Sequence, residues 1–221
     1  RASTMSSTVV DVATGVTGHS SGVFGPMLGY GANYELARIL DTVRRELVEP
    51  NLTYNVGVMA GGTPAALDDS GFRATASGKT NIVAERAVAR GDLRSLTPEQ
   101  DARTQAKMTA IVADHLAQTG ATISFFDGYP PMAPTKGNRA LLARLNAVNR
   151  DLGLPDMPEY DPAKRGAADS SFVAAFADTM GGMGASGSGA HAVGEAVDLT
   201  SIPRQALRSA VLISRLSVTP R

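Results

Sequence analysis

The chain has 221 residues, of which 43% are hydrophobic and 19% charged, and its 21 Lys and Arg residues balance 21 Asp and Glu residues. This composition indicates a globular protein with a sizeable core, and the lack of a basic block argues against nucleic acid as a partner. The absence of cysteine excludes disulfides, thiolate metal sites and a cysteine nucleophile, and no apolar run approaches the roughly 18 residues that a membrane-spanning helix needs.

Strand and helix patterns alternate from the start of the chain. Residues 8–12, TVVDV, have strand character, and a stripe of apolar residues at helical spacing follows between Leu36 and Leu47. Apolar letters then alternate with polar or small ones over 52–58 and 81–94. This alternation predicts two neighbouring strands.

A second helix and a last strand complete this part of the chain. Thr97-Pro98-Glu99-Gln100 is a capping box with Pro at the first helical position, and we expect its helix to close at Gly120. The segment 122–126, TISFF, predicts a short strand. The order strand, helix, strand, strand, helix, strand predicts an α+β domain at 5–127, a ferredoxin-like four-stranded antiparallel sheet with two helices on one face.

The Pro- and Gly-rich stretch 128–137 marks a domain boundary. Beyond it we predict helices near 138–152, after Asp169 and over 203–217, with a Gly-rich loop before the last one. This part contains little strand for its length. We therefore expect 128–221 to be part of an α/β domain whose sheet lies mostly elsewhere.

Residues 18–22 spell G-x-S-x-G after a strand, and Asp169 and His191 follow in the Ser, Asp, His order of α/β-hydrolases. This pattern predicts a serine hydrolase with Ser20 as its nucleophile. The motif requires a helix that starts at the nucleophile, whereas glycines and a proline between 22 and 31 delay the helix. A plain loop is the competing interpretation.

Asn81 and Arg94 lie thirteen residues apart in one predicted strand. Their side chains suit a carboxylate, because Arg offers a charged fork and Asn a neutral donor. An odd spacing places them on opposite faces of an ideal strand, so both reach one ligand only with a bulge or with Asn81 in the preceding loop. The competing interpretation is a solvated face on which Asp92 and Arg94 pair with each other.

A run of small residues from Gly184 leads to His191, four residues before Glu195. Neutral imidazole is a common zinc ligand, and a nearby carboxylate often fixes its tautomer. No histidine of the chain has an Asp two positions later, and no adjacent Glu-Glu occurs. One imidazole does not make a metal site, so an exposed or structural histidine is the competing interpretation.

Four features in this order resemble one family. They are the first domain with His19 in its first loop, and the strings KTNIVAERAVARGDLR, RGAADSSFVAAF and GSGAHAVGEAVDLTSIPRQALRSAVLISRL. Together, over about residues 8–217, they resemble the zinc-dependent metallopeptidase family of carboxypeptidase G, aminoacylase and succinyl-diaminopimelate desuccinylase. In that family a ferredoxin-like dimerisation domain, or lid, interrupts an α/β catalytic domain that binds two zinc ions.

The resemblance implies that 5–127 is the lid and 128–221 the C-terminal segment of the catalytic domain. The N-terminal catalytic half, with the family's His-x-Asp pair and paired glutamates, would then be absent from this chain. His191 would be the zinc ligand supplied after the lid, with Glu195 behind it. His19 would reach the partner subunit's cleft and donate to the developing oxyanion.

The resemblance also implies a substrate site and an activity. Asn81 and Arg94 would contact the carboxylate end of the substrate, and Gly166 and Asp169 would line the cleft. The complete enzyme would be a homodimer, joined through the lid, that cleaves an amide or peptide bond next to a carboxylate in a small peptide or N-acyl amino acid. This chain alone would be inactive, and a non-catalytic dimerisation and binding module is the alternative.

Overall fold

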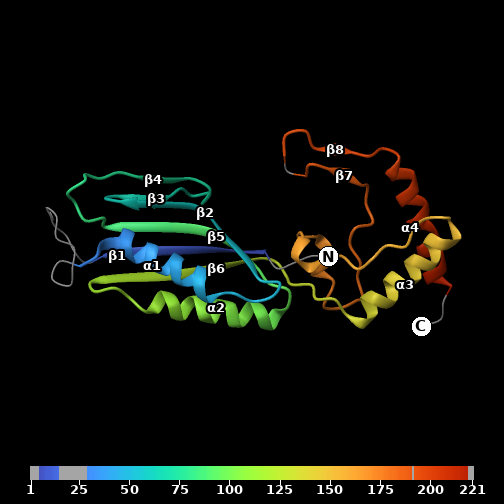
Figure 1. Cartoon of the computed structure of the whole chain (residues 1–221), viewed down its shortest axis with the longest axis horizontal. Coiled ribbons are helices and arrows are strands. Elements are labelled where there is room, and N and C mark those ends of the chain that lie inside the picture. The colour runs from blue at the N-terminus through green and yellow to red at the C-terminus, as the bar shows by residue number, and fades with distance from the viewer. Residues whose placement is uncertain (1–4, 15–28, 191, 219–221) are drawn as a thin grey trace. The chain divides into compact units, whose positions relative to one another are not determined.

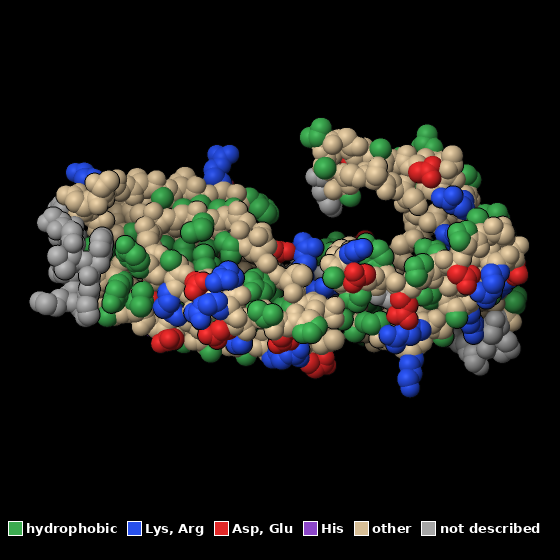
Figure 2. Space-filling view, in the orientation of Figure 1, with side chains coloured by type: hydrophobic (Ala, Val, Ile, Leu, Met, Phe, Trp, Pro, Cys, Tyr) green, Lys and Arg blue, Asp and Glu red, His purple; other side chains and the backbone are tan. Residues whose placement is uncertain are grey.

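The computed structural model describes residues 5–14, 29–190 and 192–218. The chain divides into two compact units, Ser3–Pro131 and Met132–Arg221, called here the first and the second unit. None of the described helices is both long and apolar enough to cross a membrane. Figure 2 shows Lys and Arg side chains interspersed with Asp and Glu on the visible face of each unit, so opposite charges are mixed there.

A four-stranded antiparallel sheet forms the first unit, in the order β2-β5-β1-β6 (Figure 1). The strands are β1 (Met5–Thr14), β2 (Thr53–Gly62), β5 (Arg86–Arg94) and β6 (Thr119–Tyr129). The helices α1 (Gly31–Glu46) and α2 (Pro98–Ala113) connect β1 to β2 and β5 to β6. This element order and sheet order confirm the predicted ferredoxin-like fold.

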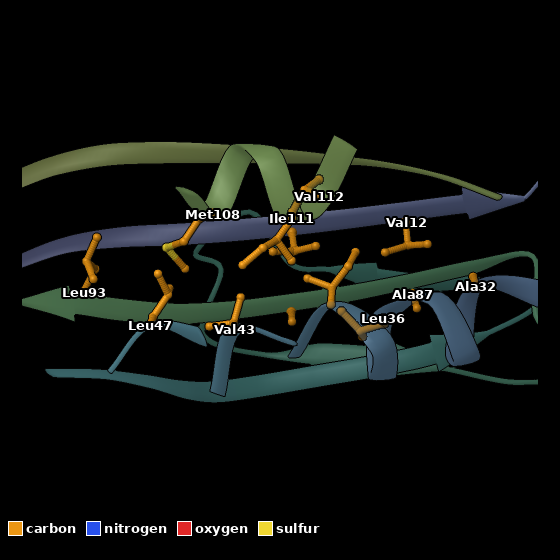
Figure 3. Packing of buried hydrophobic residues seen from close by; sticks show 13 residues of the cluster. Val12, Ala32, Leu36, Val43, Leu47, Ala87, Leu93, Met108, Ile111 and Val112 are labelled. Atoms are coloured by element: carbon orange, nitrogen blue, oxygen red, sulfur yellow. The ribbon is translucent and has the colours of Figure 1, made fainter. Parts of the chain in front are cut away.

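Both helices bury their apolar stripes against one face of the sheet. Figure 3 shows side chains of α1, α2 and the two central strands pointing toward one another. The cluster includes Val10, Val12, Leu36, Ile39, Val43, Ala87, Ala89, Leu93, Met108, Ile111 and Val112. Since each fully buried large apolar side chain contributes about 1.5–3 kcal/mol, this cluster is the main source of stability in the first unit.

The opposite face of the sheet is partly covered by a small hairpin. Val88 is buried but does not belong to the helix-side cluster, so it faces the other way. The hairpin of β3 (Ala65–Leu67) and β4 (Ala74–Ala76) lies against β5 and β2. This hairpin was not predicted from the sequence, because three-residue strands are too short to show an alternation of apolar and polar residues.

Two predicted element boundaries in the first unit are wrong. The strand predicted from Asn81 begins at Arg86, and Asn81 lies in the turn before it. The helix that begins after Thr97 ends at Ala113, and Gly120 lies inside β6. The predicted start of that helix is confirmed, since the Thr97 side chain accepts a hydrogen bond from the backbone N–H of Gln100.

A buried carboxylate explains the early end of α2. Glu35 of α1 is fully buried, and its Oε2 accepts a hydrogen bond of 2.9 Å from the N–H of Leu116. Arg38 donates from Nη2 to Glu35 at 2.6 Å and to the carbonyl oxygen of Ile111 at 2.9 Å. These side chains bind a carbonyl oxygen and an N–H group that a continued helix would have used in its own hydrogen bonds, so α2 stops there.

The hydrogen bonds around Glu35 lower the pKa of its carboxyl. Burial raises the pKa of the carboxyl, but the hydrogen bonds from Arg38 and from the N–H of Leu116, with the charge of Arg38, outweigh it. The pKa therefore lies below its ordinary value of 4.5. A carboxyl with a lowered pKa in the folded state stabilises the fold above its unfolded pKa, and this contribution is lost as the pH falls through the folded pKa.

The second unit is built on two helices, α3 (Lys136–Asp151) and α4 (Ser201–Ser217), close to their predicted ranges. They pack through a small cluster centred on Leu145, Val148 and Leu212. The helix predicted after Asp169 is wrong, because only one 3-10 turn forms there, η2 (Asp169–Phe172); a second such turn is η1 (Pro162–Lys164). The Gly-rich segment forms the hairpin of β7 (Gly187–Ser188) and β8 (Ala196–Val197) (Figure 1).

We expect Glu35→Gln to destabilise the first unit, because it leaves the Arg38 charge largely buried without its carboxylate. Breaking a buried ion pair costs about 3–5 kcal/mol, and the lower end is expected because the Gln oxygen still accepts a hydrogen bond. Urea unfolding at pH 7 measures the change. Glu46→Gln, at an exposed position of the same helix, is the control and should change the free energy of unfolding little.

Acid titration of the free energy of unfolding gives a second test of Glu35. The unmutated chain should lose stability as the pH falls below about 4.5, and Glu35→Gln should show a shallower loss over the same range. Equal slopes for the two proteins would show that Glu35 does not carry this dependence.

Candidate functional site

The pairing of β1 with β5 places the predicted substrate residues at opposite ends of the sheet. Ala13 pairs with Arg86, so the end of β1 and the start of β5 meet at one end, where Asn81 lies in the preceding turn. Arg94 is the last of the nine residues of β5 and lies at the other end. At about 3.3 Å per residue, β5 is about 26 Å long, so one first unit does not bring both side chains to one small ligand.

Arg94 lies on the sheet face that points away from the helices, where it pairs with a carboxylate of its own strand. Its Nε donates to Oδ2 of Asp92 at 2.7 Å, and both side chains are about one-third exposed. The pairing that the sequence offered as an alternative to substrate binding is therefore present in the structure. An ion pair with this exposure contributes little to stability.

Asn81 is exposed beside a polar groove of about 350 Å³. Thr80 and Ile82 line this groove from one side, and Gly61 and Gly62 at the end of β2 line it from the other. The N–H of Ile82 donates to the carbonyl oxygen of Lys79 at 3.1 Å, which closes the turn that carries Asn81.

Gly166 and Asp169 are both exposed in the second unit. Asp169 opens the 3-10 turn η2, and a Cβ atom at Gly166 would meet no other atom within 4 Å. Local packing therefore does not explain the glycine at 166. The predicted lining role of both residues stays a prediction.

The Gly-rich segment forms tight turns between β7 and β8. The N–H of Ala192 donates to the carbonyl oxygen of Gly189 at 2.9 Å, and the N–H of Glu195 donates to the carbonyl oxygen of Ala192 at 3.1 Å. Gly189 and Gly194 have φ angles of +68° and +90°, which favour glycine. The small residues before His191 thus build a hairpin.

Two of the predicted site residues, His19 and His191, lie outside the described residues, as does Ser20 of the serine hydrolase alternative. Among the residues that the structure does describe, no three His, Cys, Asp or Glu side chains come together as a metal site would require. The described part of the chain therefore does not hold a dinuclear zinc centre by itself.

Arg90 was not predicted as a site residue, and it lies on the same sheet face as Asp92 and Arg94. The sequence contained one signal for this shared face. Arg90 comes four residues before Arg94, and residues an even number apart lie on the same face of a strand. The aromatic partner of Arg90 is Phe72, which comes from the loop between β3 and β4. No pattern in the sequence predicted that loop contact.

Comparison with known proteins identifies the first unit. Residues 3–120 match the family profile of the M20 peptidase dimerisation domain. No curated protein sequence matches the chain.

Several solved structures share the fold. A tripeptidase from Staphylococcus aureus is 20% identical with a TM-score of 0.72, and the match covers 99% of this chain and 53% of that one. Aminopeptidase PepT from Bacillus cereus is 18% identical with a TM-score of 0.70, covering 98% and 52%. The YXEP protein of Bacillus subtilis, described as a dinuclear metal-binding peptidase of the M20 family, is 13% identical with a TM-score of 0.63, covering 97% and 50%.

The chain thus spans about half the length of the solved structures that it matches. At these identities the likeness shows the fold alone, whereas the family profile covers more than half of the chain. The chain belongs to the M20 family of metallopeptidases, and residues 3–120 are its peptidase dimerisation domain.

Proposed function

We propose that this chain supplies the lid and the C-terminal catalytic segment of a homodimeric, dinuclear zinc hydrolase. Its reaction is the cleavage of an amide or peptide bond next to a carboxylate. The observation that carries this proposal is the dimerisation-domain match over 3–120, in a chain whose fold follows that of peptidases along nearly its whole length.

The proposal assigns one zinc ligand to this chain, His191. The remaining ligands would come from polypeptide outside the chain, because the described residues hold no cluster of three metal-binding side chains. When bound, zinc would activate a water molecule and polarise the scissile carbonyl.

The proposed substrate contacts require two subunits. Asn81 and Arg94 lie at opposite ends of β5, too far apart for one small substrate. In a dimer, the surface beside Arg94 of one subunit can receive the partner subunit's Asn81. We therefore propose that each substrate carboxylate is held by Arg94 and by the partner's Asn81, while the partner's His19 donates to the oxyanion.

The edge of β2 is the proposed dimer surface. β2 is an edge strand of ten residues, and its sequence, TYNVGVMAGG, contains no charged residue. Exposed edge strands without charges or prolines pair readily with other strands. Tyr34 of α1 and Val56 and Met59 of β2 are exposed large apolar side chains of these two elements, and α1 packs beside β2.

We expect Met59→Lys to convert the dimer to a monomer, because each two-fold-related interface would then bury two like charges. Sedimentation equilibrium measures the dissociation constant, which should rise at least tenfold. The control is Thr122→Lys, an exposed position on the opposite edge strand β6. A dimer that survives Met59→Lys but not Thr122→Lys would place the interface at β6, and a monomeric unmutated protein would contradict the homodimer.

In the natural full-length protein, His191→Ala should lower both zinc content and hydrolysis of N-acyl amino acids, with activity reduced at least about a hundredfold. Zinc content and activity both fall because the substitution removes one of the zinc ligands. Plasma mass spectrometry of bound zinc and initial rates measure the two effects. Val193→Ala, at a fully exposed position of the same hairpin, should leave both unchanged.

Full zinc content and full activity after His191→Ala would contradict the metal-ligand role. Activity that resists a chelator and disappears with Ser20→Ala would instead establish the serine hydrolase.

A further inference from the structure

The last helix of the second unit, α4, buries an arginine. The buried stripe of this helix consists of Ser201, Gln205, Arg208 and Leu212, at the spacing of successive helical turns. Arg208 is only 6% exposed. An arginine buried to this extent is normally paired with an opposite charge, because an unpaired charge loses its hydration on burial.

Arg208 has only neutral partners among the described residues. Its Nη1 donates to Oε1 of Gln205 at 2.6 Å and lies 3.5 Å from the sulfur of Met157. Its Nε is buried and has no hydrogen-bond partner in the described part of the chain. An amide oxygen and a thioether accept hydrogen bonds from the guanidinium, but they do not balance its charge.

No side-chain carboxylate of this chain supplies the missing charge. All 21 Asp and Glu residues lie within the described residues, and none of their carboxylates lies within 4 Å of Arg208. The two exposed arginines of the same helix are paired, Arg204 with Asp198 at 3.7 Å and Arg215 with Asp151 at 2.6 Å. The buried arginine therefore lacks the opposite charge that its exposed neighbours have.

The same helix leaves large apolar side chains uncovered. Ile202, Leu207 and Ile213 are 48%, 52% and 65% exposed, although the buried stripe of α4 already packs against α3. Apolar residues beyond a single stripe are typical of a helix that is covered on more than one side. This chain covers 53% of the matched tripeptidase, so solved structures with this fold contain further polypeptide.

We propose that Arg208 forms a buried ion pair with an acidic side chain of the polypeptide that completes the catalytic domain. This inference rests on the proposed function, which places further catalytic-domain polypeptide outside this chain. The guanidinium offers Nε and an Nη atom to the carboxylate, a geometry that accepts two hydrogen bonds. The ion pair is an assembly contact, since it uses neither the proposed zinc ligand nor the proposed substrate contacts.

Replacement of Arg208 by methionine should have opposite effects in this chain and in the natural full-length protein. In this chain, Arg208→Met removes a buried charge that lacks a counter-charge, so hydrogen-exchange protection of the α4 amides should rise or stay the same. In the full-length protein it leaves the partner carboxylate buried and unpaired, so protection of α4 should fall at least about tenfold. Hydrogen exchange read by mass spectrometry measures both effects.

Arg215→Met is the matched control. Arg215 is exposed and bonded to Asp151 within this chain, so its replacement should change α4 protection by the same small factor in both proteins. Arg208→Gln keeps the test decisive if Arg208→Met does not fold in the full-length protein. It removes the charge but keeps a polar group, and it should show the same opposite effects in the two proteins.

A change of protection that has the same sign and size in both proteins would overturn the proposal. So would α4 protection in this chain that rises with added sodium acetate, but not in Arg208→Met, because the site would then bind a free carboxylate. Zinc content and turnover do not enter these measurements. The ion pair can therefore fail while the zinc hydrolase proposal stands, and the reverse.

Discussion

The antiparallel pairing of β1 with β5 is the constraint on which the rest of the structure depends. These strands occupy the centre of the sheet, and their register runs without a break from Ser6 opposite Leu93 to Ala13 opposite Arg86. The register turns Val10 and Val12 of β1, and Ala87, Ala89 and Leu93 of β5, toward the helices. A one-residue slip would turn them all to the other face, so burial of this cluster fixes the register.

This register also determines which charged side chains lie together on one face of the sheet. Since side chains alternate across a strand, the same alternation that buries Ala87, Ala89 and Leu93 places Arg90 and Arg94 together on the opposite face. Because β5 is extended, its length separates Arg94, at its end, from Asn81, in the turn before it. This separation is the physical reason for proposing that two subunits share each substrate.

Local signals predicted the strands and helices of the first unit and the start of α2, because each depends on neighbouring residues such as Thr97 and Gln100. The end of α2 could not be predicted in this way. It depends on Glu35, which is 81 residues before the N–H of Leu116 that it binds. The contact between Phe72 and Arg90 could not be predicted for the same reason, because only the fold brings this loop and β5 together.

The candidate site was predicted less completely. The sequence supplied residue types suited to a carboxylate and to zinc, but not their separation, which follows from the start of β5 at Arg86. The family assignment is confirmed, and the roles of His19, Asn81, Arg94, Gly166, Asp169 and His191 stay predictions. The type of each residue shows which ligand it suits, but not how far it lies from the other site residues in the folded chain.

The central proposal is that His191 supplies one ligand of a zinc centre whose other ligands come from polypeptide outside this chain. A crystal structure of the natural full-length protein, with anomalous scattering recorded at the zinc edge, tests it most directly. The account predicts zinc about 2.0–2.1 Å from a ring nitrogen of His191. A zinc centre whose ligands are all other residues, with the His191 ring turned to solvent, would contradict it.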